Sequence, residues 1–506
     1  MDTQIHASGT VPGMRRYLKT EEGGWRPDAS SSLLVALREP DEADGASRLL
    51  DTLEAAGTVQ EAFAERGAFA APARLGVARE AAAGDLLIEL GSVPNMSHPE
   101  AYRIEVGDYV RLIAADARAA LHGLRTILQL LSSGGGELAH GVIEDEPVVG
   151  ERALHLDIGR KFYPQEWILA RIREMSELKL NTLQLHFSEN EGFTFESERH
   201  PGVMSEQYLT KAQIREIIEE ARRHRITLIP SLDSPGHLGW ALRGRPDWLL
   251  RGANGEPAAG ALDITNPEAV AFVLDLIDEY AELFEGSPYF HIGGDEFIDF
   301  GQFAAYPQLG AYARETLGIE GGTEVDAYVA YLNAVAEALE GRGFTVRAWN
   351  DGLYREGPEQ KVELKTSVQI AYWTKWDRKM APAQTFLDKG HKLINFNDAY
   401  FYYVLGEHAG YKYPTGEKIH DDWHPGLLPR ISEEEPQEWQ VPYPEELLGC
   451  SFSVWCDKPQ AQNVEEVAAG LKGPLRAMAE KAWTGERRYA DYAAFVQACE
   501  AAGLKG

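Results

Sequence analysis

Short apolar runs recur along the chain from about residue 150 onward, and a polar or helical stretch follows each of them. Helical periodicity fills several of the intervals, for example 164–180 and 211–225. Buried strands that alternate with helices are typical of parallel α/β folds. The eight runs lie at 153–159, 181–187, 226–233, 289–294, 345–351, 367–373, 392–398 and 449–455. Eight strand–helix units predict an α/β fold of the (β/α)8 TIM barrel type with some enlarged loops.

A doubly wound parallel sheet is the rival interpretation of the same alternation. Such sheets usually carry a glycine-rich phosphate loop after the first strand. Here that position holds GRKFYP, at 159–164, which has a single glycine. The sequence therefore favours the closed barrel.

The first 150 residues have a different pattern. Residues 101–116 alternate around a Gly-Asp turn and predict a hairpin, and 117–133 have helical periodicity that ends at three glycines. Residues 142–152 are predicted to be a linker. We therefore expect a small α+β supporting domain over 1–148 and, over 149–506, a (β/α)8 barrel with C-terminal helices that carries the chemistry.

The charge of the chain narrows its partners. Acidic residues outnumber basic ones by 79 to 49, for a formal net charge of −30. Such a surface repels phosphate backbones and anionic lipids, so we expect neither nucleic acid nor a membrane as partner, and solubility is the simpler explanation of the charge. The chain has no apolar run of about eighteen residues, and its first twenty residues have no apolar signal core. It is predicted to be cytoplasmic unless a signal was removed.

Three cysteines, Cys450, Cys456 and Cys499, form no CxxC spacing. The odd count argues against a disulfide framework. A bridge between Cys450 and Cys456 is conceivable, but buried thiols are the simpler expectation because both lie in one apolar run.

Chemistry in a barrel of this kind is carried by residues at the C-terminal ends of the strands. Those positions hold Arg160 and many carboxylates, and three of the predicted strand ends include a tryptophan, at Trp349, Trp373 and Trp455. Any one tryptophan is more simply explained as a cap on the barrel core. Together with acidic hydrogen-bond acceptors, however, three of them form the kind of aromatic wall that suits the flat C–H faces of a sugar.

The adjacent pair Asp295-Glu296 follows two glycines at the end of the fourth run. Adjacent strand residues point in different directions, so the two carboxylates cannot easily face each other across a glycosidic bond as in the usual two-carboxylate mechanism. One can protonate the leaving oxygen while the other acts elsewhere on the substrate. This geometry suits substrate-assisted catalysis, in which the sugar's own 2-acetamido oxygen attacks the anomeric carbon.

At these positions the sequence resembles glycoside hydrolase family 20, and within it the dispersin and lacto-N-biosidase branch. The matching motifs cover about residues 152–460. The upstream domain, in addition, resembles the small α+β domain of that family. The matching stretches are LHLDIGRKFYP (154–164), LQLHFSENEGFTFES (183–197), LIPSLDSPGHLGWAL (228–242), YFHIGGDEF (289–297), RAWNDGL (347–353), the strand that ends at Trp373, NFNDAYFYY (395–403) and SFSVWCD (451–457).

The resemblance implies three catalytic roles. Glu296 resembles the general acid/base, whose pKa the site should raise. Asp295 resembles the residue that orients the acetamide N–H and stabilises an oxazolinium-like intermediate. Tyr402 resembles the hydroxyl that binds the acetamide carbonyl, with Tyr400 and Tyr403 as alternatives in the same run.

The resemblance also implies the substrate-binding residues. Arg160 would clamp the 3- and 4-hydroxyls of the terminal sugar, and Trp349, Trp373 and Trp455 would form the walls of the pocket. The groups that position the catalytic pair would be Asp233, His237 and His291. For the two histidines, an ordinary place in the core is an equal alternative.

The expected activity is that of a retaining, exo-acting β-N-acetylhexosaminidase on oligosaccharides or glycoconjugates, with no cofactor and no metal. One position departs from the family pattern, because Asp457 stands where many members have glutamate. A shorter acid leaves room for a second sugar. A lacto-N-biosidase that releases a Gal-GlcNAc disaccharide is therefore an alternative, and a poly-N-acetylglucosamine hydrolase is a further one. GlcNAc against GalNAc, the linkage and the oligomeric state are left open.

Two other function classes compete with this interpretation. A metal-dependent barrel hydrolase usually has an HxH pair on its first strand, whereas this chain has His155-Leu156-Asp157 there. A sugar-binding module without activity would be expected to have lost one member of the catalytic pair, but both Asp295 and Glu296 are present.

Overall fold

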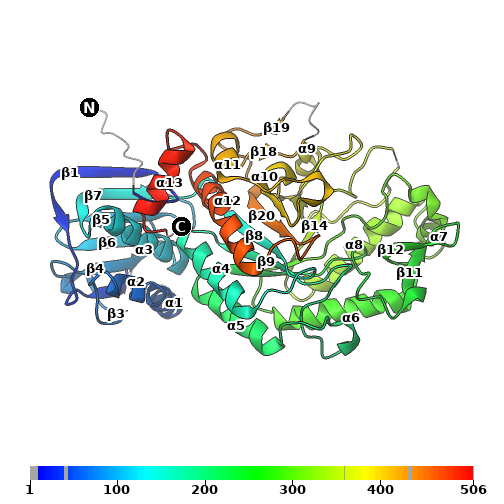
Figure 1. Cartoon of the computed structure of the whole chain (residues 1–506), viewed down its shortest axis with the longest axis horizontal. Coiled ribbons are helices and arrows are strands. Elements are labelled where there is room, and N and C mark those ends of the chain that lie inside the picture. Colours follow the sequence, from blue (N-terminus) through cyan, green and yellow to red (C-terminus); the bar gives the residue numbers. More distant parts are fainter. Residues whose placement is uncertain (1–8, 39–43, 358, 431–435, 505–506) are drawn as a thin grey trace.

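The structure, a computed structural model, describes residues 9–38, 44–357, 359–430 and 436–504. Residues 1–8 of the predicted first domain, and of the stretch predicted to lack a signal, lie outside this range, as do residues 505–506 of the predicted second domain. A sheet lies at one end of the long axis and a barrel at the other (Figure 1). In the described residues, no helix combines the length and the apolar character that a membrane crossing needs.

The N-terminal sheet has seven strands in the order β1-β7-β5-β6-β4-β2-β3. Helices α1 (Gly45–Gly57) and α3 (Ala117–Ser133) pack against it, and α2 (Gln60–Ala64) follows α1. The strands are β1 (Arg16–Trp25), β2 (Leu33–Leu37), β3 (Arg74–Leu75), β4 (Leu86–Leu90), β5 (Tyr102–Val106), β6 (Val110–Ala114) and β7 (Leu138–Asp145).

The predicted hairpin and helix of this region are confirmed. Strands β5 and β6 pair antiparallel, with Tyr102 opposite Ala114, and Asp116 caps α3 by accepting a hydrogen bond from the Ala119 N–H. The predicted linker at 142–152 is wrong at both ends. Residues 142–145 belong to β7, which pairs with β5 and has alternating buried and partly exposed side chains. Residues 151–152 begin β8. Only 146–150 connects the two strands.

Eight parallel strands form the barrel, as predicted. Strand β20 pairs with β8 on one side and with β16 on the other, which closes the sheet on itself. The strands are β8 (Glu151–Asp157), β9 (Thr182–His186), β10 (Thr227–Ser231), β13 (Tyr289–His291), β14 (Thr345–Trp349), β15 (Gln369–Tyr372), β16 (Leu393–Asn395) and β20 (Leu447–Trp455).

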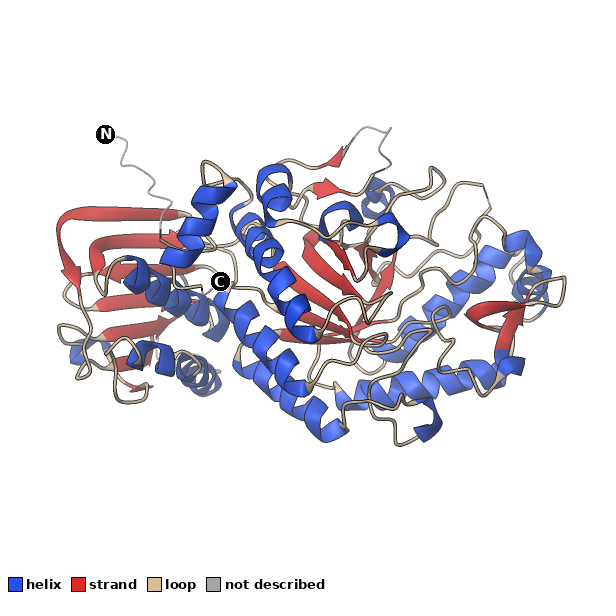
Figure 2. Ribbon diagram, viewed as in Figure 1, coloured by secondary structure: helices blue, strands red, loops and turns tan. Residues whose placement is uncertain are grey.

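Helices lie outside the barrel strands (Figure 2). The two segments predicted to be helical contain α4 and α5, and a capping box of Thr210 and Gln213 begins α5. The helices are α4 (Gln165–Glu177), α5 (Lys211–Arg223), α6 (Pro267–Leu283), α7 (Pro307–Glu315), α8 (Glu324–Glu340), α9 (Ala383–Asp388), α10 (Asp398–Phe401), α11 (Gly416–Asp422), α12 (Val464–Thr484) and α13 (Tyr492–Ala501). The enlarged loops contain β11 (Leu249–Arg251), β12 (Pro257–Leu262), β17 (Tyr402–Val404), β18 (Leu427–Leu428) and β19 (Gln437–Glu438).

All three cysteines are free and buried, as the sequence predicts. Cys450 and Cys456 lie on and just after β20, and Cys499 lies on α13. Burial raises the pKa of each of these thiols, which keeps them protonated and unreactive.

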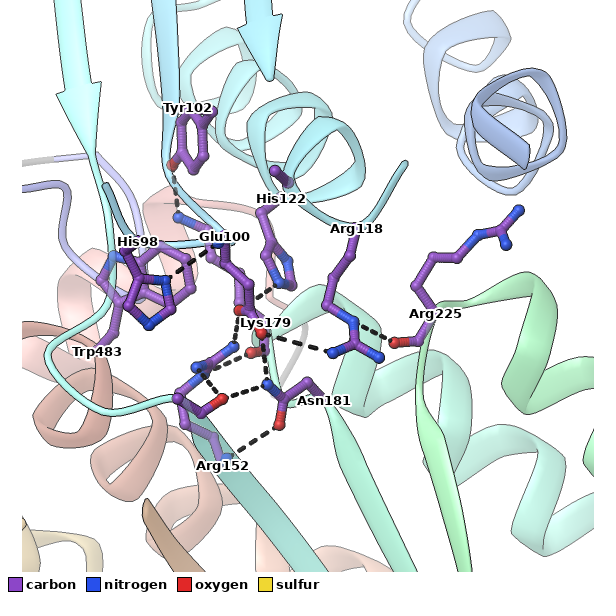
Figure 3. A network of polar contacts seen from close by, with 12 residues as sticks. His98, Glu100, Tyr102, Arg118, His122, Arg152, Lys179, Asn181, Arg225 and Trp483 are labelled. Atoms are coloured by element: carbon purple, nitrogen blue, oxygen red, sulfur yellow. Dashed lines mark hydrogen bonds and ion pairs between the residues drawn. The ribbon is translucent and has the colours of Figure 1, made fainter. Parts of the chain in front are cut away.

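A buried network of charged groups joins the N-terminal sheet to the end of the barrel at which its strands begin (Figure 3). The Arg152 guanidinium, at the start of β8, pairs with the carboxylate of Glu100. Glu100 also accepts a hydrogen bond of 2.6 Å from the side-chain amide of Asn181 and lies 3.0 Å from the ring of His122. Burial alone would raise the pKa of Glu100, but Arg152 and His122 outweigh it and hold that pKa well below its usual range.

A second pair extends this network. The Lys179 ammonium donates 3.1 Å to Asp145 and 2.8 Å to the Tyr102 hydroxyl. The indole of Trp483, on α12, donates 2.9 Å to the other oxygen of Asp145. Lys179 and Asp145 are both fully buried. Because each charge has a partner on the other unit, the sheet and the barrel stabilise each other.

We expect Glu100→Gln to lower the free energy of unfolding by about 3–5 kcal/mol, because it leaves Arg152 buried without its counter-charge. Urea denaturation followed by circular dichroism measures this change. Glu105→Gln is the matched control, since Glu105 is on the same sheet and pairs with Arg103 at the surface; it should lose no more than about 1 kcal/mol. Equal losses in the two variants would contradict the assigned role of the network.

Candidate active site

A cavity of about 330 Å³ opens at the C-terminal ends of the barrel strands. All the residues singled out from the sequence line it, except Asp233 and His291, which are buried beneath it. The lining residues are Arg160, Glu189, His237, Asp295, Glu296, Trp349, Trp373, Trp376, Asp398, Tyr402, Val404, Ala409, Tyr411, Trp455 and Asp457. Side chains from widely separated parts of the chain therefore meet in one pocket.

The Asp295-Glu296 pair lies in a bend beyond β13 rather than on the strand. Strand β13 ends at His291, and Gly293 and Gly294 follow with φ of 78° and 96°. A Cβ on Gly293 would lie 2.6 Å from the carboxyl carbon of Asp233, so only glycine lets the chain pass there. The two side chains do differ in environment, but because of this turn and not because of strand alternation.

Exposure separates the two carboxylates of the pair. The Asp295 side chain is 11% exposed and that of Glu296 is 53% exposed. Glu296 itself has a positive φ of 44°, which is unfavourable for a residue with a side chain. The surroundings must therefore hold the backbone of Glu296 in place.

Asp351 supplies that support. One of its carboxylate oxygens accepts the backbone N–H of Glu296 at 3.1 Å, and the other accepts the indole N–H of Trp373 at 3.1 Å. Burial and the nearby charge of Glu296 raise the pKa of Asp351 to about 6. The sequence assigns no role to Asp351, although its position directly after Trp349-Asn350 at the end of a predicted strand is a signal for it.

His237 lies between the Asp295-Glu296 pair and a third carboxylate. Its Nδ1 is 2.8 Å from Glu189, and its Nε2 is 3.4 Å from Asp295 and 3.5 Å from Glu296. Burial lowers the pKa of His237, but Glu189 and Asp295 outweigh it and raise that pKa well above its usual range. His237 is therefore an imidazolium at neutral pH. The sequence assigned no role to Glu189, because its pairing with His237 joins two different strand ends.

The pKa of Glu296 differs from the expectation. We expected the site to raise it, but the hydrogen-bonding imidazolium of His237 lowers it despite partial burial. The prediction is wrong because it took no account of a cation beside this carboxylate. For Asp295 the direction is the opposite, since burial raises its pKa well above the usual range and the neighbouring carboxylates of Asp233 and Asp351 add to the effect.

Tyr402 reaches the cavity from an element that the sequence did not separate from the seventh strand. Strand β16 ends at Asn395; the helix α10 follows, and Tyr402 begins β17, which pairs with β20. The ring of Tyr402 stacks on Trp373 with centroids 5.5 Å apart. Of the two alternatives, Tyr403 donates to Gln462, and Tyr400 lies outside the cavity lining.

Arg160 lies beside Trp455 in the cavity wall and contacts three carboxylates. Its guanidinium contacts Asp157 at 3.0 Å, Glu189 at 2.8 Å and Glu191 at 3.2 Å, and it lies 5.8 Å from the ring centre of Trp455. Asp457 lies at the rim on the same side, 3.4 Å from His408. These contacts hold Arg160 in place at the cavity wall.

Asp233 and His291 are buried and do not line the cavity. The Gly293 N–H donates to Nδ1 of His291 at 3.1 Å, and the His291 ring packs on Trp349 with centroids 4.5 Å apart. Burial lowers the pKa of His291 well below its usual range, so the ring is neutral. Asp233 lies 3.6 Å from His186.

In the described residues no group of three or more His, Cys, Asp or Glu is arranged to hold a metal ion.

We expect Glu189→Gln to make His237 titrate at a lower pH, because the carboxylate that stabilises the imidazolium is gone. An NMR titration of the histidine ring nitrogens measures this. Glu191→Gln is the control, since the exposed Glu191 pairs with Arg160 and not, among the described residues, with His237. A His237 titration unchanged by Glu189→Gln would refute the pairing.

Two family models match the chain. "Glycosyl hydrolase family 20, catalytic domain" matches residues 151–486, and "Glycosyl hydrolase family 20, domain 2" matches residues 26–146. The first lies over the barrel and the second over the N-terminal sheet. The family expected from the motifs is therefore the one found.

Curated relatives and solved structures agree with this family. A lacto-N-biosidase of Bifidobacterium bifidum is 26% identical over 78% of this chain and 34% of its own length. A chitooligosaccharidolytic β-N-acetylglucosaminidase of Ostrinia furnacalis is 32% identical over 67% of this chain and 58% of its own. The chain thus spans about a third of the first relative and less than two thirds of the second.

Among solved structures, a Flavobacterium johnsoniae chitobiase aligns with a TM-score of 0.76 at 21% identity, over 99% of this chain and 73% of that one. A Streptomyces plicatus N-acetyl-β-hexosaminidase aligns with a TM-score of 0.71 at 19% identity, over 100% and 97%. At these identities the likeness is one of fold. Since the catalytic-domain model covers well over half of the residues, the chain belongs to glycosyl hydrolase family 20.

Proposed function

We propose that the protein is a retaining, exo-acting β-N-acetylhexosaminidase that hydrolyses terminal β-linked N-acetylhexosamine from oligosaccharides or glycoconjugates. The observation that carries this proposal is the unequal pair on one loop. Asp295 is buried, whereas the neighbouring Glu296 is half exposed and reaches an open cavity. Such a pair suits a reaction in which one carboxyl group exchanges protons and the other steadies a group of the substrate.

In the first step Glu296 donates a proton to the glycosidic oxygen. The bond between that oxygen and C1 breaks, and the acetamide carbonyl oxygen of the same sugar bonds to C1 from the other face. Asp295 accepts the acetamide N–H, and the Tyr402 hydroxyl donates to the acetamide oxygen. The stacked rings of Tyr402 and Trp373 form a wall for the acetamide group.

In the second step water attacks C1 and the bond to the acetamide oxygen breaks. Glu296, now a carboxylate, accepts the proton of that water. Two inversions at C1 leave the product with the configuration of the substrate, so the reaction is retaining. The enzyme itself forms no covalent bond to the sugar.

Glu296 must be protonated at the start, although His237 lowers its pKa in the open pocket. A sugar in the cavity excludes water from the Glu296 carboxylate, and desolvation raises the pKa of a carboxyl group. The His237 imidazolium, 3.5 Å away, lies close enough to hold the proton that Glu296 uses. Substrate binding therefore favours the protonated acid.

A second candidate activity, release of a disaccharide, is favoured by Asp457. Its carboxylate lies at the cavity rim, 27% exposed, and contacts His408 rather than closing the pocket. A longer glutamate at this position would reach further toward the terminal sugar. The Bifidobacterium bifidum relative, which matches 78% of this chain, is named as a lacto-N-biosidase.

We expect Glu296→Gln and Asp295→Asn each to reduce kcat for an aryl N-acetyl-β-glucosaminide by about 10²–10⁴-fold, because each removes an interaction formed in the transition state. Asp299→Asn, an exposed carboxylate on the same loop, is the control and should retain activity. A thiazoline analogue of the intermediate should inhibit the wild type and bind Asp295→Asn much more weakly. Full activity of Glu296→Gln would overturn the proposal.

A comparison of aryl glycosides separates the two candidate activities. The monosaccharide proposal predicts a higher kcat/KM for the aryl glycosides of GlcNAc or GalNAc than for the aryl lacto-N-bioside. Disaccharide release predicts the reverse order, because the second sugar would then contribute binding energy to the transition state. Steady-state release of the aryl group measures each value.

A further inference from the structure

One large aromatic side chain at the cavity is not buried. Trp376 lines the cavity and is 52% exposed, and of the tryptophans, all of which the structure describes, it alone is exposed. Trp349 and Trp373 are 1% and 7% exposed. Packing against the barrel core therefore explains the other rings of this wall, but it does not explain an indole at the rim.

The position of Trp376 follows from ring contacts around the cavity. Arg160 lies over Trp455, whose ring is 5.8 Å from Tyr402. Tyr402 stacks on Trp373, and the edge of Trp373 meets Trp376 with centroids 4.8 Å apart at 69°. Trp376 is therefore at the opposite end of this aromatic series from Arg160.

Glu296, the proposed general acid, is connected to the Trp373–Trp376 side of the cavity through Asp351. Asp351 accepts from the Glu296 backbone with one oxygen and from the Trp373 indole with the other, so Glu296 and Trp373 share one support. Arg160, in contrast, has Asp457 as its neighbour on the rim. A sugar whose terminal hydroxyls face Arg160 and whose glycosidic oxygen faces Glu296 directs its leaving group toward Trp376.

The loop that carries Trp376 is anchored. Arg355 donates 3.0 Å to the Asp351 carbonyl and pairs with Asp377, the residue after Trp376. The Lys379 N–H donates 3.0 Å to the Asp377 carboxylate. These contacts tie the loop to the end of β14, so the exposed indole is presented on a fixed backbone rather than on a free one.

From this arrangement we propose that Trp376 forms a separate binding site for the leaving group, in which the indole face stacks on a pyranose. The proposal rests on the proposed function and adds the chemical class of the leaving group. A pyranose offers a face of C–H bonds that packs on an aromatic ring.

Two substrates with the same transferred sugar test this proposal. N-acetyl-β-glucosaminyl fluoride has a single atom as its leaving group, whereas N,N′-diacetylchitobiose has a sugar. We expect Trp376→Ala to lower kcat/KM for the disaccharide about tenfold, which corresponds to 1.4 kcal/mol, and to leave that for the fluoride unchanged within about twofold. Trp376→Phe keeps an aromatic face and should retain most of the activity on the disaccharide.

The outcomes separate this proposal from the proposed function. An equal loss on both substrates would place Trp376 in the site of the transferred sugar, and no loss on either would show that its ring binds nothing; both results overturn the proposal. If the wild type hydrolyses neither substrate, the proposed function fails and this inference fails with it. Thermal unfolding of each variant shows whether an activity change reflects folding, since the side chain is more than half exposed.

Discussion

The pairing of β20 with both β8 and β16 is the constraint on which the site depends. It closes eight parallel strands into one ring, so that all their C-terminal ends meet at a single rim. Arg160 follows the first strand and Asp457 follows the last, and closure brings both to the same cavity. In an open sheet these two strands would lie at opposite edges.

Closure also brings several carboxylates close together, and their mutual repulsion must be offset by nearby cations. Glu189, Asp295 and Glu296 meet around His237, and the Arg160 guanidinium pairs with Glu189. These two cations offset part of the mutual repulsion of the acids, and His237 lowers the pKa of Glu296. Burial and the neighbouring carboxylates nevertheless raise the pKa of Asp295. Neighbouring residues of one loop thus acquire different protonation behaviour.

The opposite end of the barrel serves a different purpose. There Glu100, Arg152, Lys179 and Asp145 form a fully paired charged network between the N-terminal sheet and the barrel. A buried charge is stable only beside its partner, so this interface favours one relative position of the two units over others. The N-terminal sheet therefore contacts the barrel at the end where the strands begin, away from the residues that line the cavity.

The sequence by itself determined the barrel, since alternation of apolar runs and helices is a local pattern, and it determined the family through motifs in order. It also named most of the residues that line the cavity, because they directly follow predicted strands. Only the tertiary structure decided that 142–145 belongs to β7, that Tyr402 begins β17, and that Glu189 and Asp351 support His237 and Glu296. The direction of the pKa of Glu296 belongs with these, because it depends on the distance to His237, and the folded chain alone sets that distance.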